Sequence, residues 1–351
     1  MRQRDCGSLA IAAAAALALL GCAQRPQPFA AGDPAAAAAH AGPPIKWLLQ
    51  GQANDTAESA WASEHRRFGD LVRAATNGQL DIAYASDVVQ DTEVLAAVRS
   101  KQLNIGFAGV QYQSEEPLMN FQLLPIVPND RLPEILALLK PRFSEIWQKR
   151  WNVRLLAFSY YLPQLLYSAR PAPTLKSLQG QRIRQYSPDT MKLYARAGAR
   201  PVEIKRVTDV VGHIFDGRLD GAQSALPAYV NWGWADKLKY ISNWPLGSVY
   251  MALVVNMDDW NSLTPHLQRE LSKAADEIEQ RQWNSRQASI DALIAEAAGK
   301  FGSRVVNPPQ SEVDELLSNV KPILEDWKKQ VGPDSALVLA AINKVLGTDY
   351  R

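Results

Sequence analysis

The chain is poor in cysteine, in net charge and in long apolar runs. Among its 351 residues are 2 cysteines, Cys6 and Cys22, which leave no disulfide or thiol chemistry to a domain that begins after them. The 38 basic and 36 acidic side chains give a formal charge of +2. Such a balance creates no strong positive potential that would attract a polyanion, which disfavours a nucleic-acid partner. No internal stretch approaches the ~20 apolar residues of a membrane span, which excludes a multispan membrane protein.

The common signatures of catalysis are absent as well. The 4 histidines are not spaced as metal ligands, and the sequence contains no His-Glu-x-x-His, no Gly-x-Ser-x-Gly and no glycine-rich phosphate loop. Because catalytic groups can be scattered along a chain, this absence lowers the expectation of an enzyme without excluding one. We expect a protein with no catalytic residues, no metal and no cofactor.

The N-terminal region has the pattern of a leader followed by a tether. Two arginines precede about a dozen apolar residues, too few to span a bilayer. The run ends in Leu-Leu-Gly-Cys, which resembles a bacterial lipoprotein signal acylated at Cys22. We predict a signal peptide over 1–21 and a disordered Ala/Pro tether over 22–44, which holds a periplasmic domain at a membrane whose identity is left open. The alternative is an ordinary signal peptide cut near residues 30–32.

The rest of the chain alternates the patterns of strands and helices. Its 10 Trp, 11 Tyr and 8 Phe can bury a large core. Thr264-Pro265 opens a helical pattern with no breaker until Gly299 and Gly302, over thirty residues or ~50 Å. A helix of this length exceeds the width of a small domain, so we expect an α/β protein whose two lobes it spans. Strands are predicted over 45–49, 80–84, 103–107, 153–158, 182–186 and 249–256, and helices over 61–75, 93–101, 133–151, 191–197 and 207–215.

Five short segments follow one another in an order typical of one family. They read Thr-Asn-Gly-Gln-Leu at 76–80, Leu-Gln-Gly-Gln-Arg-Ile-Arg at 178–184, Gly-Ala-Arg-Pro-Val at 198–202, Phe-Asp-Gly-Arg-Leu-Asp-Gly at 215–221 and Val-Asn-Met-Asp-Asp-Trp-Asn-Ser-Leu at 255–263. In order and spacing they resemble the DctP-like extracytoplasmic solute-binding proteins of TRAP transporters, from about Ile45 to the end of the long helix.

This resemblance implies a two-lobed periplasmic-binding-protein fold with the ligand cleft between the lobes. Lobe I would comprise 45–161 and 250–289, and lobe II 162–249 and 290–351. The implied function is to capture a small organic acid and deliver it to a TRAP-type permease driven by an ion gradient. The partners would be the acid, the permease subunits and, through the lipid anchor, a membrane. Two alternatives remain: a ligand-sensing lipoprotein that feeds a sensor kinase and, less favoured, a periplasmic enzyme on a similar fold.

Arg184 is the residue that the resemblance implicates in ligand binding. In the family, the arginine of the corresponding Lys-Ile-Arg strand usually pairs with the ligand's carboxylate. The planar guanidinium fits both carboxylate oxygens, and a carboxylate leaves water only for such partners. Without the resemblance, the favoured interpretation would be a surface arginine on a strand.

The chain departs from the family at two positions that bear on the ligand. Gln164 stands where many members carry a second arginine, which argues against a dicarboxylate and favours a monocarboxylate. Gln223 and Ser224 follow Asp220-Gly221, where members often have Glu and then Asn or Trp. Without that carboxylate, a calcium or sodium site is not expected. The alternative for Gln223 and Ser224 is a polar helix start.

Other candidates follow from their position along the chain. Gln52 follows the first predicted strand, and Phe107 and Gln111 follow the third, at the strand ends where open α/β sheets bind ligands. Trp244 and Tyr250 flank Pro245-Leu246-Gly247, a predicted crossover between the lobes. The alternative for these aromatic residues is an ordinary place in the core.

Overall fold

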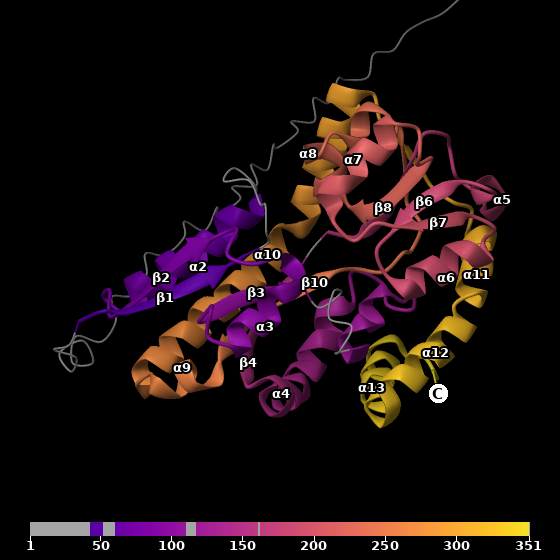
Figure 1. Ribbon diagram of the computed structural model, residues 1–351. Coiled ribbons are helices and arrows are strands. Elements are labelled where there is room, and N and C mark those ends of the chain that lie inside the picture. The colour runs from indigo at the N-terminus through magenta and orange to yellow at the C-terminus, as the bar shows by residue number, and fades with distance from the viewer. Residues whose placement is uncertain (1–42, 52–59, 110–116, 161, 351) are drawn as a thin grey trace, which may run out of the picture.

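Two β-sheets organise the computed structural model, which describes residues 43–51, 60–109, 117–160 and 162–350 (Figure 1). The first sheet has the order β2-β1-β3-β10-β4, and the second β11-β9-β5-β8-β6-β7. Helices flank both sheets, and each sheet with its helices forms one lobe.

The first sheet is mixed. Strand β1 lies parallel to β2 and β3, whereas β10 lies antiparallel between β3 and β4. Helix α2 packs on β2, α3 on β3 and α4 on β4. The elements of this lobe are β1 (Ile45–Gln50), α2 (Ala60–Ala75), β2 (Leu80–Ala85), η1 (Asp91–Glu93), α3 (Val94–Arg99), β3 (Ile105–Gly109), η3 (Pro117–Leu123), α4 (Leu132–Trp151), β4 (Val153–Tyr160), β10 (Tyr250–Asn256) and α9 (Met257–Ser262).

The second sheet is mixed as well. Strands β8, β6 and β7 run parallel, and β5 lies antiparallel to β8 and β9. Its elements are β5 (Gln164–Ser168), α5 (Leu175–Leu178), β6 (Arg182–Gln185), α6 (Pro188–Arg196), β7 (Arg200–Glu203), α7 (Val207–Phe215), β8 (Gly221–Ala225), α8 (Leu226–Asn231), η4 (Trp234–Asp236), β9 (Tyr240–Ser242) and β11 (Arg304–Val306).

Two crossovers bring one edge of each sheet to the junction of the lobes. Strand β4 ends at Tyr160 and β5 begins at Gln164, while β9 ends at Ser242 and β10 begins at Tyr250. Gln164 pairs with Ala225, so the carboxyl end of β8 lies at the same edge as the start of β5. The carboxyl ends of β3 and β4 in the first sheet and of β6 and β8 in the second therefore lie at the junction.

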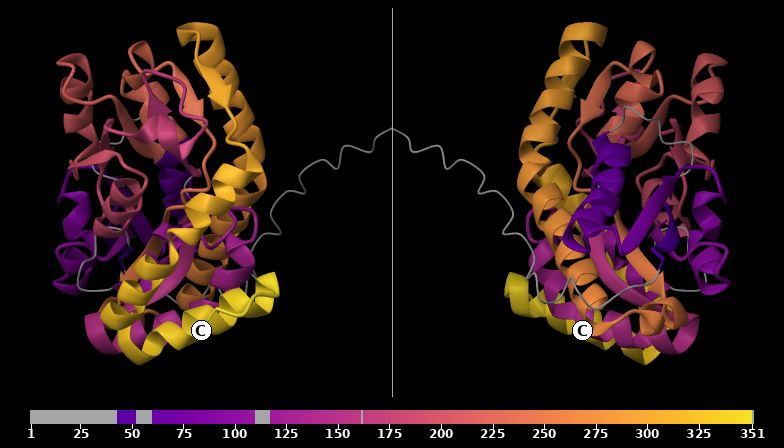
Figure 2. Two further views of the ribbon diagram at one scale, coloured as in Figure 1. Left: turned by 90° about the vertical axis from the view of Figure 1, so that its right-hand side faces the viewer. Right: turned by 90° about the vertical axis from the view of Figure 1, so that its left-hand side faces the viewer.

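Helix α10 (Pro265–Phe301) links the lobes as the sequence predicts. Its 37 residues contact β4 and α2 in the first lobe and α8 in the second (Figure 2). The Thr264 hydroxyl accepts a hydrogen bond from the Leu267 amide at 3.3 Å, and Gly302 ends the helix at a φ of 67°. The expected cap and stop are both confirmed.

The three C-terminal helices return from the second lobe to the first. They are α11 (Gln310–Ser318), α12 (Lys321–Val331) and α13 (Ser335–Leu346). Helix α12 contacts η3 and α6, and α13 contacts α4 (Figure 2). The sequence analysis assigned these helices to lobe II. That assignment stays a prediction, namely that the helices move with the second sheet when the lobes close.

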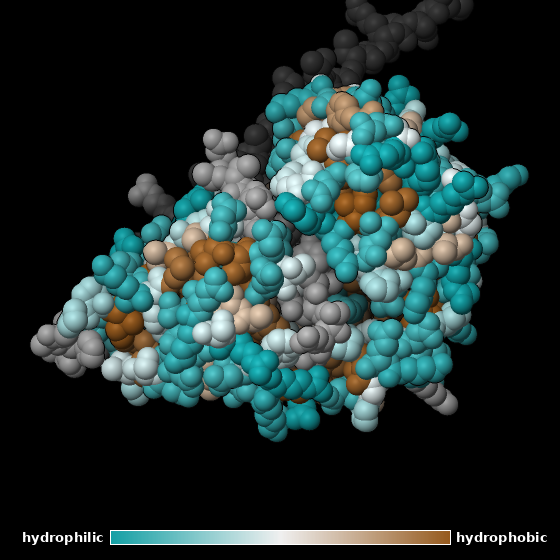
Figure 3. All heavy atoms as spheres, in the orientation of Figure 1, coloured by the Kyte–Doolittle hydropathy of each residue, from teal (hydrophilic) through white to brown (hydrophobic). Residues whose placement is uncertain are grey.

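One apolar cluster runs through both lobes. It joins Phe143 of α4 and Tyr250 of β10 to Leu166 and Ile183 of the second sheet and to Trp327 of α12. Outside, hydrophilic side chains cover most of the face in Figure 3, and apolar ones form small separate patches. The lobes therefore share part of one core.

Candidate functional site

Arg184 of β6 is buried at the carboxyl edge of the second sheet, with 1% of its surface exposed. Its Nε donates to the Ile204 carbonyl at 2.8 Å, Nη1 to the Gln223 carbonyl at 2.9 Å and Nη2 to the Lys205 carbonyl at 3.1 Å. These three acceptors fix the plane of the guanidinium. A guanidinium held in one plane matches the two oxygens of a carboxylate.

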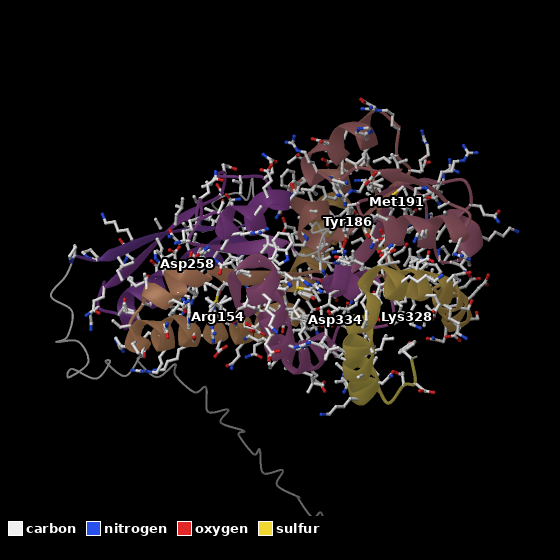
Figure 4. All side chains as sticks on the ribbon, turned by 60° about the horizontal axis from the view of Figure 1, so that its bottom comes forward. Arg154, Tyr186, Met191, Asp258, Lys328 and Asp334 are labelled. Atoms are coloured by element: carbon white, nitrogen blue, oxygen red, sulfur yellow. The ribbon has the colours of Figure 1, made fainter. Side chains whose placement is uncertain are left out.

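Tyr186 connects Arg184 to Gln164. The guanidinium carbon lies 4.7 Å from the centre of the Tyr186 ring, a cation–π contact. The Tyr186 hydroxyl donates to Oε1 of Gln164 at 2.8 Å, and both side chains are buried. Figure 4 shows Tyr186 near the middle of the molecule. The structure thus brings the two predicted residues together through a tyrosine that the sequence analysis did not select.

Gln223 and Ser224 lie within strand β8, so the alternative of a polar helix start is wrong. The carbonyl of Gln223 holds Arg184, while its side chain is fully buried. Ser224 is half-buried and pairs with Leu165 of β5. A polar strand of five residues has no apolar alternation to reveal it, and β8 is recognisable only by its pairing with β5 and β6.

The candidate in the first lobe is Phe107, which lies within β3 and not after it. Its ring is buried and stacks on His65 of α2, with ring centres 3.8 Å apart. Burial, with a smaller effect of the Arg66 charge, lowers the pKa of His65 to about 3, so this imidazole is neutral. Gly51, the residue after β1, lies close to the same imidazole: a Cβ added at Gly51 would be 2.5 Å from Nδ1 of His65. The sequence analysis missed His65 because a lone histidine in a helix carries no distinctive pattern.

The two crossover aromatics lie in the core. Trp244 is 2% exposed and donates its indole N–H to the Ala172 carbonyl at 2.9 Å. Tyr250 is fully buried, and its hydroxyl donates to the Met119 carbonyl at 3.3 Å. Neither of these contacts places a ring next to Arg184. A ligand-binding role for Trp244 and Tyr250 therefore stays a prediction. Gln52, Gln111 and Cys22 lie outside the described residues.

The printed contacts of the buried Arg184 guanidinium are three backbone carbonyls and the ring of Tyr186. Over the described ranges, no group of three or more His, Cys, Asp or Glu side chains is placed to hold a metal ion. In the same part of the chain, no helix has both the length and the apolar character needed to cross a bilayer. The arrangement can bind an anion at Arg184 and hydrogen-bond to its neutral parts.

Comparisons with known proteins identify a family and a fold for the chain. The family model DctP, described as bacterial extracellular solute-binding protein family 7, matches residues 52–330. DctP7 of Bordetella pertussis, an extracytoplasmic solute receptor binding pyroglutamic acid, is 24% identical with a TM-score of 0.77, over 85% of this chain and 99% of its own. DctP6 of the same organism, also described as binding pyroglutamic acid, is 23% identical with a TM-score of 0.78, over 86% and 100%.

A more distant structure has the same fold. A TRAP periplasmic solute-binding protein from Desulfovibrio desulfuricans with bound sn-glycerol-3-phosphate is 17% identical with a TM-score of 0.78, over 88% of this chain and 99% of its own. None of the curated proteins compared matches the chain. The expected two-lobed architecture is confirmed.

Proposed function

Because the chain belongs to the DctP family of bacterial extracellular solute-binding proteins, we propose that it captures a small organic acid with one carboxylate and hands it to a TRAP-type permease. Capture needs two lobes that close on the ligand, and no chemical step is required of the protein. Binding and release would be the whole of its activity.

The observation that carries this proposal is the burial and fixed orientation of the Arg184 side chain. Its guanidinium is buried, and the three hydrogen bonds described for it end on neutral carbonyls. A carboxylate placed there replaces lost hydration with a charge-assisted pair. The burial and the fixed plane of this guanidinium therefore support carboxylate binding at Arg184.

The neutral surroundings favour a single carboxylate. Gln164, at the position of a second arginine in many relatives, is occupied by Tyr186 through a neutral hydrogen bond. A second carboxylate buried there would meet no cation from this residue and would keep its desolvation cost. Pyroglutamic acid, which the two Bordetella receptors bind, is a monocarboxylate of the kind that we propose.

We further propose that Cys22 carries a lipid and that the segment after it tethers the receptor in the periplasm. Two features support the anchor: the apolar run before Cys22 and the Ala/Pro composition that follows it. The extracellular character of the family supports the location.

Binding of organic acids to the purified protein tests the proposed function. A monocarboxylate at a hundredfold excess over its Kd should stabilise the parent by ~2.7 kcal/mol, visible as a rise of a few degrees in melting temperature. Arg184→Ala and Arg184→Lys should both lose this rise, because neither presents the planar fork. The matched control is Arg182→Ala, two residues along the same strand and paired with Asp220 at the surface, which should bind as the parent does. Parent-like binding by both Arg184 variants would overturn the proposal.

A further inference from the structure

Arg154 of β4 is a half-buried arginine without a carboxylate partner. It lies in the first lobe, apart from Tyr186 of the second lobe (Figure 4). Its guanidinium carbon is 4.4 Å from the centre of the Trp260 ring in α9. Within the described part of the chain, Arg154 makes no hydrogen bond or ion pair, and its Nε is buried. Burial also lowers the pKa of Arg154. The described residues thus leave this charge without a counter-ion.

Arg154 lines a groove of about 420 Å³ along the edge of the first sheet. Strand β4 is the last in the order β2-β1-β3-β10-β4, so one side of its backbone faces no other strand of this sheet. Arg154, Leu155 and Leu156 form the floor of the groove. Helices α4 and α10, which both pack on β4, form its walls.

The backbone at the floor of the groove can accept further hydrogen bonds. In an antiparallel pair, every second residue directs its N–H and C=O away from the partner strand. Farther along β4, Glu279 of α10 accepts a hydrogen bond from the Phe158 amide at 3.2 Å. No other side chain among the described residues covers the backbone at 154–156 in this way. On the α4 wall, Pro141 has no N–H for the Ala137 carbonyl, which therefore lacks its usual helical partner.

The groove has the length of a short extended peptide. The residues of α4 that line it run from Ala137 to Gln148, a rise of ~16 Å, which about five extended residues would cover. On β4, Leu156 lies at a register shift against β10, between Leu155 and Ala157. Because such a bulge bends a strand, it limits any added strand to a short segment.

The two ends of the groove differ in charge. Toward Phe158, Lys140 of α4 reaches across to α10 and pairs with Asp276 at 3.3 Å and Glu279 at 2.9 Å. This end therefore carries one positive and two negative charges. At the start of β4, Arg154 carries a positive charge that no described carboxylate balances. A complementary segment has an acidic side chain at the Arg154 end only.

We propose that this groove docks an extended segment of a protein partner, which adds to the edge of β4 and places an Asp or Glu side chain on Arg154. A peptide supplies both the backbone groups that a strand edge pairs with and the carboxylate that a guanidinium pairs with. A free anion would satisfy Arg154 alone, and an apolar segment would leave Arg154 without a counter-ion. The inference does not depend on the bound acid, because Arg184 lies in the other lobe.

Phage-displayed random heptapeptides, selected on the purified protein, test the inference. The selected peptides should share an Asp or Glu. A synthetic copy, followed by fluorescence polarisation, should bind Arg154→Gln at least about tenfold more weakly than the parent, as expected for a lost charge-assisted hydrogen bond. Replacing the peptide's acidic residue by its amide should weaken binding to the parent by a similar factor and binding to Arg154→Gln by less than about threefold.

Two further variants separate docking from folding. Arg142→Gln is the matched control on the same helix, since Arg142 pairs with Glu145 and does not line the groove, and it should bind the peptide as the parent does. Ser144→Tyr should block the peptide by filling the groove while Arg154 stays in place. Arg184→Ala should bind the peptide as the parent does, and Arg154→Gln should bind organic acids as the parent does.

The remaining outcomes distinguish this inference from the proposed function. Selected peptides without acidic residues, equal binding by Arg154→Gln and Arg142→Gln, or full binding by Ser144→Tyr would overturn the docking inference alone. If no peptide is selected but inorganic phosphate binds and is lost in Arg154→Gln, the groove is a small-anion site and the inference is wrong. If no organic acid binds while the peptide does, the proposed function is wrong and the docking groove is confirmed.

Discussion

Arg184 and His65 are both buried, and their surroundings act on their charges in opposite ways. Three carbonyls support the charge of Arg184, whereas burial with the charge of Arg66 lowers the pKa of His65 to about 3. The buried arginine of this pair lies in the second lobe, on β6. The buried face of Phe107 and His65 in the first lobe is neutral.

His65 makes the stability of the protein depend on pH. Its folded pKa lies below the unfolded value of about 6.5, so between pH 6.5 and about 3 the unfolded chain binds the extra proton. The free energy of unfolding should therefore fall as the pH falls through this window, by ~2 kcal/mol between pH 7 and pH 5 from this residue. Urea denaturation at the two pH values measures it.

The comparison needs a variant that does not titrate at this position. His65→Gln should lose ~2 kcal/mol less than the parent between pH 7 and pH 5. Equal pH dependence in the parent and His65→Gln would show that His65 does not carry the effect.

The motif predicted Arg184 but could not predict what surrounds it. The Arg-Ile-Arg segment sets the position of the cation, and its two-residue spacing alone cannot say which arginine is buried. Arg182 pairs with Asp220 and is partly exposed, while Arg184 is buried by carbonyls from β8 and the segment after β7. Tyr186 escaped the sequence analysis because its hydrogen-bond partner, Gln164, comes from β5.

At the scale of elements, the crossover between β9 and β10 depends on one glycine. Gly247 has a φ of 80°, and its carbonyl accepts from the Gln164 amide at 3.2 Å. A Cβ there would lie 2.3 Å from the Gln122 carbonyl oxygen. This position therefore requires both the left-handed backbone and the absence of a side chain.

We expect Gly247→Ala to destabilise the fold by more than ~2 kcal/mol, because backbone strain and a backbone clash add together. The shift in melting temperature measures it. Gly180→Ala is the control, since its φ is 72° and nothing lies within 4 Å of an added Cβ. It should cost only ~1 kcal/mol, the backbone penalty alone. Similar losses for the two variants would contradict a steric role for Gly247.

Element bounds were predictable where local chemistry sets them. The N-cap and the terminating glycine predicted the two ends of α10. Asn77 and Gly78, both at positive φ, end the turn after α2 as expected. Helix α7 matches the predicted 207–215. Strands β5, β7, β8, β9 and β11 were not predicted, because they are short and their hydrogen-bond partners are distant in sequence.

At the scale of the molecule, the C-terminal helices tie the lobes through the shared core. Trp327 of α12 is fully buried, and its indole N–H donates to the Pro117 carbonyl of η3 at 2.9 Å. Helix α12 also contacts α6 of the second lobe. Removal of α12 would expose the shared core to solvent in both lobes.

Trp327→Ala should cost ~3–5 kcal/mol, the usual range for deleting a large buried aromatic side chain. Urea denaturation followed by circular dichroism measures it. Leu317→Ala on α11 is the control, since this side chain is 36% exposed and its loss should stay within ~0.5 kcal/mol. A small effect at Trp327 would mean that α12 contributes little to the core.

The strands of the two sheets alternate along the chain. Strands β1 to β4 come first, β5 to β9 build the other sheet, β10 returns to the first and β11 to the second. No single cut in the gene separates the lobes, and a recombination that exchanged either half would break both sheets. The five strands around Arg184, β5 to β9, could be exchanged only by cutting both crossovers at once, and the exchanged segment would still have to pair with β11 of the parent chain.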